Sequence, residues 1–489
     1  MSVITRLFSS VDSPKRNQVL WLAWWRAVQS LRPAASHQIT FLWLGVVLAA
    51  LCLRPDLAGV TSLVRGLGLS AASYYCLLHF FHSRALNLDR LTQLWQATLL
   101  RLLGRHLVRV AGRPVVVADG LKRPKEGKKM PAVKSLHQES HDNSKANYIM
   151  GHSLQALALL VQAAGCCLAV PISARIHEGL RWSRSQRATL IDKLGQLLLG
   201  FQWSEPVILV ADAYYAAAKL IRALRTAHHH LVSRLRSNAT AYFSPPRQRK
   251  RRPGRPRTYG HKTHLRDWFT YQANFKRTRS PVYGETQVQL RYLSADLLWR
   301  PLGQLVRFVW VIHPRRGKVI LLCTDLTLQP LDIIRLYGWR FKIEVSFRAA
   351  IHTVGVYAYH FWMKTMKPRH RGDGNQNLDR KSPTYRQAVQ RKMSAYHTHI
   401  QLGLIAQGLL QYLAVCFRRA AWSNFHTYIR TASPQKPPSE WVVAQALHHS
   451  WPQFLKFSSE SRILKKFLAR KITPRLCAQR ELMELKAAA

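Results

Sequence analysis

Acidic residues are scarce in this chain, where 23 Asp and Glu stand against 74 Lys and Arg over 489 residues, giving a formal net charge of +51. A compact fold must overcome the self-repulsion of so much charge of one sign, so solubility alone does not account for it. The imbalance indicates a polyanionic partner. Nucleic acid is favoured, because Lys and Arg release counterions when they neutralise phosphates, and an anionic membrane surface is the alternative.

Cysteine is also sparse, and the seven residues include no Cys-x-x-Cys pair and no regular spacing. This excludes a small secreted scaffold held by disulfides and predicts a reduced, intracellular protein. The first residues include Arg6 but no continuous apolar run followed by a small-residue cleavage site, so a secretory signal is not expected.

Long apolar runs are few. The uncharged run 40–53 is too short to cross a bilayer and suits a buried helix. The uncharged run 153–173 is long enough, but Ala163-Ala-Gly165 and Pro171 interrupt it, which favours two buried strands joined by a turn. A basic membrane protein is therefore the less favoured interpretation.

Two of the few carboxylates follow strand-like runs. Residues 114–119 read Pro-Val-Val-Val-Ala-Asp, and residues 206–212 read Pro-Val-Ile-Leu-Val-Ala-Asp. Such β-branched runs are typical of strands buried on both faces, so Asp119 and Asp212 are predicted at the C-terminal ends of strands. Taken singly, either Asp could instead cap a helix or make a turn.

The elements around these runs follow a definite order. We expect strands over 115–119, 151–162 and 166–175, a helix from Ser185 as N-cap to Phe201, the strand ending at Asp212, a helix over 214–226 and a strand over 231–235. This β-β-β-α-β-α-β order is the ribonuclease H-like arrangement, in which the first and fourth strands lie side by side. It would bring Asp119 and Asp212 to neighbouring strand ends, within reach of shared metal ions.

A third carboxylate lies in a helical pattern that begins at Leu331. Tyr337, Arg340 and Glu344 are separated by three and four residues, so the pattern predicts that they share one helical face. By itself the spacing is also that of an ordinary helical ion pair between Arg340 and Glu344. Three hard carboxylate ligands are nevertheless what Mg²⁺ needs when phosphates supply the remaining oxygens.

The segment around this carboxylate, Tyr337-Gly-Trp-Arg340-Phe-Lys-Ile-Glu344, matches a known family signature. It resembles the Tyr-x2-Arg-x3-Glu-x6-Lys signature of bacterial insertion-sequence transposases of the DDE class, in the branch with a β-rich insertion before the catalytic Glu. The first three positions match, whereas Ile351 stands where the signature has Lys, with Arg348 as a neighbouring substitute. The resemblance extends over roughly residues 115–355 and rests on three elements in the right order.

The resemblance implies a mechanism. Asp119, Asp212 and Glu344 would hold two Mg²⁺ ions, or Mn²⁺ in their place, which activate water or a 3′-hydroxyl for in-line displacement at a DNA phosphodiester. Cleavage at terminal inverted repeats and strand transfer into target DNA would then be one type of reaction. A DNA hairpin intermediate is implied as well, which needs an unstacked base held on an aromatic surface. Trp310 is a candidate wedge, although a core role is favoured for it.

The resemblance also implies partners and a location. We expect double-stranded DNA, as terminal repeats and as target, a homodimer on paired ends, no membrane, and a cytoplasmic, nucleoid-associated position in a bacterium. Because Ile351 replaces the signature lysine, a catalytically decayed element protein that only binds DNA is the alternative.

Basic segments supply further DNA-binding candidates. The tract 245–257 contains Pro253-Gly254-Arg255-Pro256, which resembles an AT-hook core fitted to a narrow minor groove, and a flexible charged linker is an equal alternative. The segment 122–129 follows Asp119 and predicts a loop that contacts phosphates. The DNA-binding candidates are Tyr337, Arg340, Arg348, Lys122, Arg123, Arg252, Arg255 and Arg257.

The expected fold class is α/β, a ribonuclease H-like mixed-sheet catalytic core with an inserted β-subdomain, plus helical N- and C-terminal regions. The stretch 367–377 has the composition of a mobile loop, and 393–419 that of a long apolar helix. The expected regions are a basic helical DNA-binding region (1–110), the first part of the core (111–236), an inserted β-rich subdomain with the basic tract (237–330), completion of the core with the Glu helix (331–420), and a basic helical C-terminal region (421–489).

Overall fold

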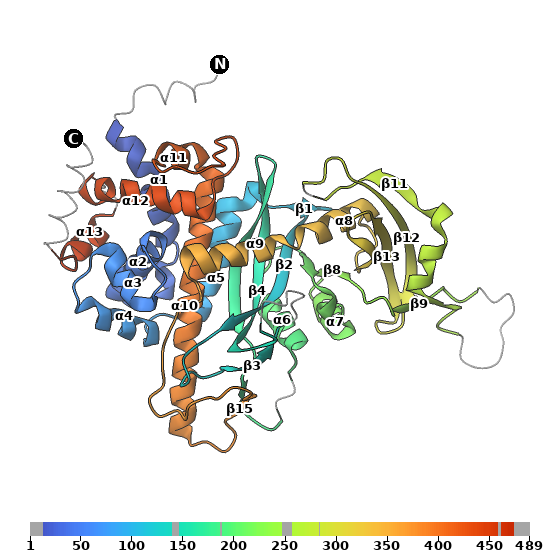
Figure 1. Cartoon of the computed structure of the whole chain (residues 1–489), viewed down its shortest axis with the longest axis horizontal. Coiled ribbons are helices and arrows are strands. Elements are labelled where there is room, and N and C mark those ends of the chain that lie inside the picture. The colour runs from blue at the N-terminus through green and yellow to red at the C-terminus, as the bar shows by residue number, and fades with distance from the viewer. Residues whose placement is uncertain are drawn as a thin grey trace.

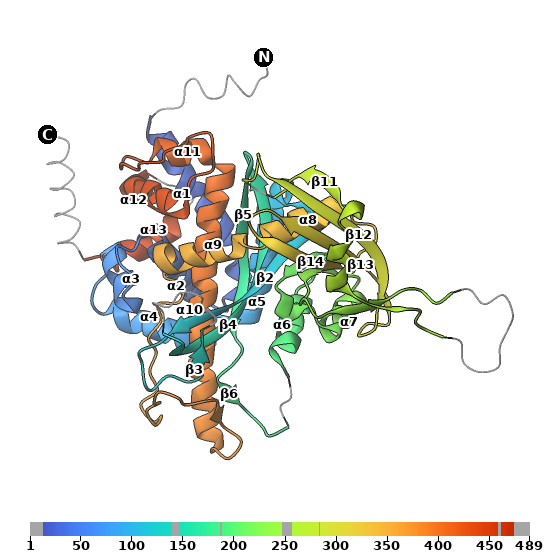
Figure 2. The ribbon, with the colours of Figure 1, turned by 45° about the vertical axis from the view of Figure 1, so that its right-hand side comes forward.

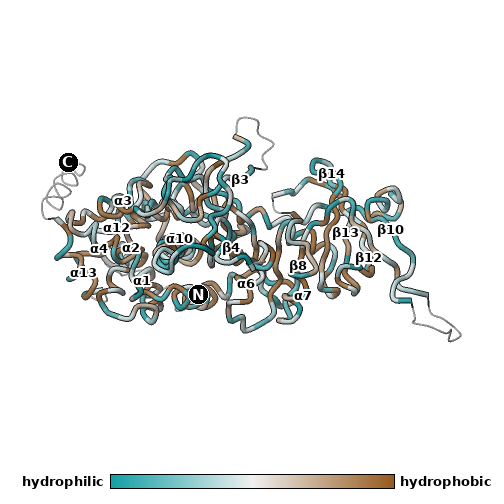
Figure 3. The backbone as a smooth tube through the Cα atoms, turned by 90° about the horizontal axis from the view of Figure 1, so that it is seen from below, coloured by the Kyte–Doolittle hydropathy of each residue, from teal (hydrophilic) through white to brown (hydrophobic). Residues whose placement is uncertain are grey.

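The computed structural model describes residues 13–138, 146–185, 188–246, 257–282, 284–457 and 461–473. Arg252 and Arg255, with most of the AT-hook-like tract, lie outside these residues. Three parts follow one another along the long axis: a layer of helices, a central sheet, and a second set of strands continuous with that sheet (Figures 1 and 3).

The centre of the sheet is strand β2 (Arg113–Pro124). It pairs antiparallel with β4 (Tyr148–Ala163) on one side and parallel with β7 (Ile208–Ala211) on the other. Beyond these, β5 (Cys166–Ile176) pairs antiparallel with β4, and β8 (His230–Arg234) pairs parallel with β7. The order β5-β4-β2-β7-β8, with these directions, is the ribonuclease H-like arrangement, and the expected fold class is confirmed.

Burial explains why these runs are strands. Residues 115–118 of β2 and all of β7 are fully buried, as expected of apolar strands covered on both faces. The uncharged run 153–173 forms the β4–β5 hairpin, as its internal turn predicted. After Asp119 the burial of β2 changes to an alternating pattern and the strand continues to Pro124. The prediction that Asp119 ends a strand was therefore wrong, because β4 supplies backbone partners up to Gly151.

The two helices of the core begin later than predicted. Helix α6 (Leu190–Leu199) starts after Thr189, which exchanges capping hydrogen bonds with Asp192, so Ser185 is not its N-cap. Helix α7 (Ala218–Thr226) follows a 3-10 turn over Ala213–Tyr215 that occupies the predicted first helical turn.

The region between β8 and residue 330 is rich in strands. Its members are β9 (Thr240–Tyr242), β10 (Lys262–His264), β11 (Lys276–Arg279), β12 (Gln289–Trp299), β13 (Gln304–His313) and β14 (Gly317–Cys323). Strand β14 pairs with β8, so the inserted strands extend the core sheet. Trp310 is fully buried on β13, stacked on Trp268 with ring centroids 4.5 Å apart, so it has the core role that was favoured over a wedge.

Helices from both ends of the chain share one layer (Figure 1). The N-terminal members are α1 (Ser13–Gln29), α2 (Gln38–Leu53), α3 (Gly59–Leu67), α4 (Ser73–His82) and α5 (Leu88–Leu103), and the C-terminal members are α11 (Arg418–Ser423), α12 (Glu440–Phe457) and α13 (Arg462–Ala469). Trp21 of α1 stacks on Phe454 of α12 and donates a 2.9 Å hydrogen bond to the carbonyl of Leu447. The two terminal regions therefore form a common core.

Helix α10 (Pro383–Cys416) packs on β5 of the sheet and also contacts α2, α5 and α12 of this layer (Figure 2). Gln401 of α10 donates to the carbonyl of Ile172 on β5 at 2.9 Å. Within the part of the chain that is described, α10 is the one helix long and apolar enough to cross a membrane, and 89% of its apolar window is buried inside the protein.

Close packing of α10 on α5 gives a test of this arrangement. A Cβ at Gly408 of α10 would lie 2.4 Å from Cζ2 of the fully buried Trp95. We expect Gly408→Ala to lower the free energy of unfolding by about 1–3 kcal/mol through overpacking, although Ala favours helix more than Gly. Urea denaturation measures the change. Gly104→Ala, where a Cβ meets nothing within 4 Å, is the control, and equal stability of the two variants would contradict the packing.

Candidate active site

Asp119 and Asp212 lie side by side because β2 and β7 run parallel. Val117 pairs with Val210, so the same register carried two residues further sets Asp119 beside Asp212, which directly follows β7. Oδ1 of Asp119 accepts a 2.8 Å hydrogen bond from the backbone N–H of Gly120. The two carboxylates predicted from the sequence are thus brought together at one point of the sheet.

Glu344 reaches the same point from a pair of short helices. The single helix predicted through Tyr337, Arg340 and Glu344 was wrong, since α8 (Pro330–Trp339) and α9 (Lys342–Ala349) are separate. Between them the backbone N–H groups of Arg340, Ile343 and Glu344 each bond to the carbonyl three residues earlier, which tightens the chain at this turn. Arg340 keeps right-handed helical dihedral angles, so its spacing to Glu344 still brings the two side chains together.

The guanidinium of Arg340 joins two of the three carboxylates. Its Nη1 lies 2.6 Å from Oδ2 of Asp119, and its Nη2 lies 2.9 Å from Oε1 of Glu344. Arg340 and Asp119 expose less than a fifth of their side chains, whereas Glu344 is 56% exposed. Asp119 and Arg340 are therefore largely shielded from water, and Glu344 lies on the solvent side of them.

Burial governs the protonation of Asp119. It raises the pKa of this carboxyl to about 6, because desolvation outweighs the opposing effects of Arg340 and the Gly120 N–H, and the nearby negative charges of Glu344 and Asp212 add to the rise. Burial, the largest single influence, would lower the pKa of Arg340, but Asp119, Tyr337, Glu344 and Asp212 together outweigh it and the net change is upward. Asp119 thus keeps its proton at a higher pH than an ordinary carboxyl does, and it lies beside the permanently charged guanidinium of Arg340.

The donor set fits a hard divalent cation in its chemistry. Asp119, Asp212 and Glu344 offer only carboxylate oxygens, from two adjacent strands and one helix, which are the ligands Mg²⁺ prefers. Among the described residues, no group of three or more His, Cys, Asp or Glu side chains lies close enough to hold a metal ion. Arg340 lies between two of the carboxylates, so its guanidinium and a metal ion would compete for the same oxygens.

The other DNA-binding candidates lie on several different segments. Arg348 is exposed on α9, and Arg257 is exposed ahead of β10. Lys122 is exposed, with Nζ donating to the carbonyl of His137 at 2.7 Å, and Arg123 is half-buried. The prediction of a loop over 122–129 was wrong in part, because residues 122–124 belong to β2. Ile351 is half-buried in the π-helical turn Ala350–Val354.

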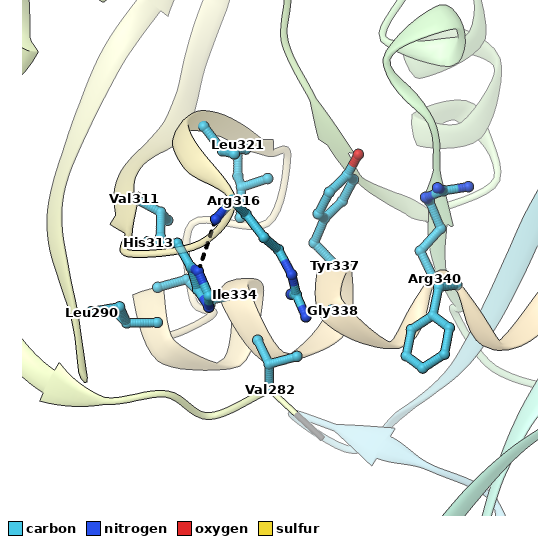
Figure 4. Close-up of a pocket in the computed structure, with 12 residues that line it drawn as sticks. Val282, Leu290, Val311, His313, Arg316, Leu321, Ile334, Tyr337, Gly338 and Arg340 are labelled. Atoms are coloured by element: carbon cyan, nitrogen blue, oxygen red, sulfur yellow. Dashed lines mark hydrogen bonds between the residues drawn. The ribbon is translucent and has the colours of Figure 1, made fainter. Parts of the chain in front are cut away.

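A cavity of about 360 Å³ adjoins Arg340, between α8 and strands β13 and β14 (Figure 4). Its lining residues are Val282, Leu290, Val311, His313, Arg316, Val319, Leu321, Ile334, Tyr337, Gly338, Arg340 and Phe341. Figure 4 shows Arg316 extending from the β13–β14 turn towards α8. Tyr337 lies on α8, and Arg340 directly follows the end of that helix. No local sequence pattern predicts this cavity, because its walls come from segments far apart in the chain and carry no shared motif.

The raised pKa of Asp119 gives a prediction about stability. Between pH 3.8, the ordinary pKa of this carboxyl, and about pH 6, Asp119 holds a proton in the folded chain that it has released in the unfolded chain. The free energy of unfolding therefore falls as the pH rises through this window. We expect Asp119→Asn, with a chelator present, to raise the free energy of unfolding by about 1–3 kcal/mol at neutral pH and by little near pH 4. Chemical denaturation at both pH values checks this, with the exposed Asp267→Asn as control. A gain that did not depend on pH would contradict the assignment.

Comparison with known proteins places the chain in a family. The family model described as DDE superfamily endonuclease matches residues 31–291, which include Asp119 and Asp212 and end before Glu344. No curated protein matches the chain. Among solved structures, the chain is similar to the cryo-EM structure of the piggyBac transposase synaptic complex with hairpin DNA, with 10% sequence identity and a TM-score of 0.32 over 88% of this chain and 74% of that one. Because the family model covers more than half of the 489 residues, the chain belongs to the DDE superfamily endonucleases.

Proposed function

We propose that this protein is a transposase that cuts DNA at the terminal inverted repeats of its element and joins the ends to target DNA. The observation that carries the proposal is the meeting of Asp119 and Glu344 on one guanidinium, with Asp212 on the adjoining strand end. Membership of the endonuclease family and the net charge of +51 support DNA as the substrate.

In this proposal Asp119, Asp212 and Glu344 hold two Mg²⁺ ions, or Mn²⁺ in their place. When bound, the ions activate the attacking oxygen and stabilise the leaving oxygen of an in-line displacement. Asp119 must be ionised to serve as a ligand, so its raised pKa couples ligation to release of a proton.

Arg340 has two alternative partners in the proposed reaction. Its guanidinium bridges Asp119 and Glu344. A guanidinium binds a phosphate with the same two-pronged geometry as a carboxylate, so an incoming DNA phosphate offers an equivalent partner. Transfer of Arg340 to the phosphate would free carboxylate oxygens at the moment when the substrate arrives. Tyr337, whose ring centre lies 6.0 Å from this guanidinium, would steady it.

The remaining assignments extend this function. Arg348, Lys122, Arg123 and Arg257 would contact the DNA backbone, together with Arg252 and Arg255. A homodimer would pair two ends of the element in the cytoplasm, at the nucleoid. Residues 1–110 would bind DNA, 111–236 and 331–420 would form the catalytic core, 237–330 would be the insertion, and 421–489 would complete the helical layer.

Metal-dependent cleavage tests the proposal directly. With Mg²⁺ or Mn²⁺ and DNA carrying the cognate repeats, we expect Asp119→Asn, Asp212→Asn and Glu344→Gln each to lower the cleavage rate by at least about 10³-fold, because a lost ligand removes several kcal/mol of transition-state stabilisation. Binding of the same DNA should persist. The control Asp267→Asn removes a carboxylate that is 57% exposed and, among the described residues, forms an ion pair with the exposed Arg266.

Two outcomes would change the assignment. Cleavage that persists in Asp119→Asn would contradict the catalytic role of the three carboxylates. Binding without cleavage by the unaltered protein would favour the decayed, DNA-binding alternative that Ile351 suggests.

Competition by Arg340 gives a second prediction. In the absence of DNA, we expect Arg340→Gln to bind Mn²⁺ about 10-fold more tightly, as measured by electron paramagnetic resonance, because it removes the cation that shares the carboxylate oxygens, a change of about 1.4 kcal/mol. Its affinity for DNA should fall. Arg335→Gln, which breaks only a 3.1 Å pair with Asp332 on α8, is the control. Weaker Mn²⁺ binding by Arg340→Gln would mean that Arg340 positions the ligands and does not compete.

A further inference from the structure

The chain after α9 returns along the far end of β2. Residues 357–373, here called the return segment, lie against the residues that follow β2. The backbone N–H of Met363 donates to the carbonyl of Lys129 at 3.0 Å, and that of Arg369 donates to Lys128 at 2.7 Å. The N–H of Ser135, on β3 (Lys134–His137), donates to the carbonyl of Asp373 at 2.7 Å. The prediction of a mobile loop over 367–377 was therefore wrong, because the backbone of β3 and of the residues after β2 binds it.

Buried side chains fix the return segment in place. Tyr359 is fully buried and stacks on Tyr396 of α10, with ring centroids 4.9 Å apart. The hydroxyl of Tyr396 donates to the carbonyl of Phe361 at 2.6 Å. The buried Lys125 donates its ammonium protons to the carbonyls of Tyr357 and Tyr359, and its Nζ lies 3.6 Å from the centre of the Tyr359 ring. An interior lysine thus attaches the segment to β2.

Trp362 points out of this rigid framework. Its neighbours Phe361 and Met363 are buried, whereas Trp362 is 65% exposed. The indole lies beside Gly127, where an added Cβ would come within 3.0 Å of its Nε1. A large aromatic ring held in solvent on a fixed backbone forgoes the burial that its apolar surface favours.

Exposed cations flank Trp362 on the two paired segments. Lys128 and Lys129 precede it on one segment, and Lys364 and Lys367 follow it on the other, and all four are exposed. Residues 122–129 and 357–373 contain two acidic side chains, Glu126 and Asp373, against nine Lys and Arg, so positive charge dominates the surface. Phosphate-binding cations around an exposed aromatic face are the combination by which proteins bind single-stranded nucleic acid, with the backbone on the charges and a base stacked on the ring.

We propose that Trp362, Lys128, Lys129, Lys364 and Lys367 form a binding surface for unpaired DNA, with one base stacked on Trp362. The proposal rests on the proposed function, because strand cleavage is what would supply an unpaired end. Six residues of extended strand separate Asp119 from Lys125, a length of roughly 20 Å. At about 3.4 Å per nucleotide of stacked strand, the surface would hold DNA about six nucleotides from the scissile phosphate.

Fluorescence anisotropy with two probes tests this surface. One probe is a fully paired duplex, and the other is the same duplex with a single-stranded extension, both in chelator at several salt concentrations. We expect Trp362→Ala to weaken binding of the extended probe about 10-fold and to leave the paired duplex nearly unchanged, because only an unpaired base is free to stack. Trp362→Phe should recover most of the loss. Equal effects on both probes, or no effect on either, would overturn the stacking assignment.

The charged part of the surface has a matched control. Lys128→Gln, Lys129→Gln and Lys364→Gln combined should lower the salt-dependence slope for the extended probe by about 2, since each phosphate contact on a single strand contributes about 0.7. The control combines Arg419→Gln, Arg430→Gln and Lys436→Gln, which remove the same charge from exposed positions in the α11–α12 region, at the other end of the helical layer (Figure 1). An equal drop in the control would show that overall charge, and not this surface, determines binding. Because these measurements use no metal, their failure is distinguishable from failure of cleavage.

Discussion

Parallel pairing of β2 with β7 is the constraint on which the candidate site depends. The pairing of Val117 with Val210 determines the positions of Asp119 and Asp212. A slip of one residue would turn Asp119 to the other face of the sheet. The pairing is secured by burial, because the β-branched residues before both aspartates are covered on each face. The position of the chemistry is thus a consequence of hydrophobic packing that begins several residues away.

At this point of the sheet, Arg340 offsets the electrostatic repulsion among the carboxylates. Two sheet carboxylates and Glu344 repel one another, and the protein lowers that cost by placing a guanidinium among them. The tightened turn between α8 and α9 sets the angle at which Arg340 enters. The guanidinium thus stabilises the protein through the same carboxylate oxygens that the proposed reaction needs.

The sequence was most informative where local pattern and burial agree. The apolar runs before Asp119 and Asp212, the turn inside 153–173 and the spacing of Arg340 to Glu344 predicted the core sheet and the proximity of the site residues. Other features depend on partners distant in the chain. Residues after Asp119 remain in a strand because β4 continues beside them, and 367–377 is ordered because Lys128 and Ser135 bond to it. The cavity beside Arg340 and the surface around Trp362 form where such segments meet, so no local sequence pattern predicts them.

The hydrogen bonds between β14 and β8 make the inserted strands the outer half of a single sheet. Strand β8 is consequently an interior strand, and removing the insertion would leave its backbone N–H and C=O groups unpaired along an open edge. Open edges of apolar strands recruit other chains, so a shortened protein would tend to aggregate instead of folding as a smaller nuclease. The inserted strands are therefore part of what keeps the core sheet closed, and not an independently folded module.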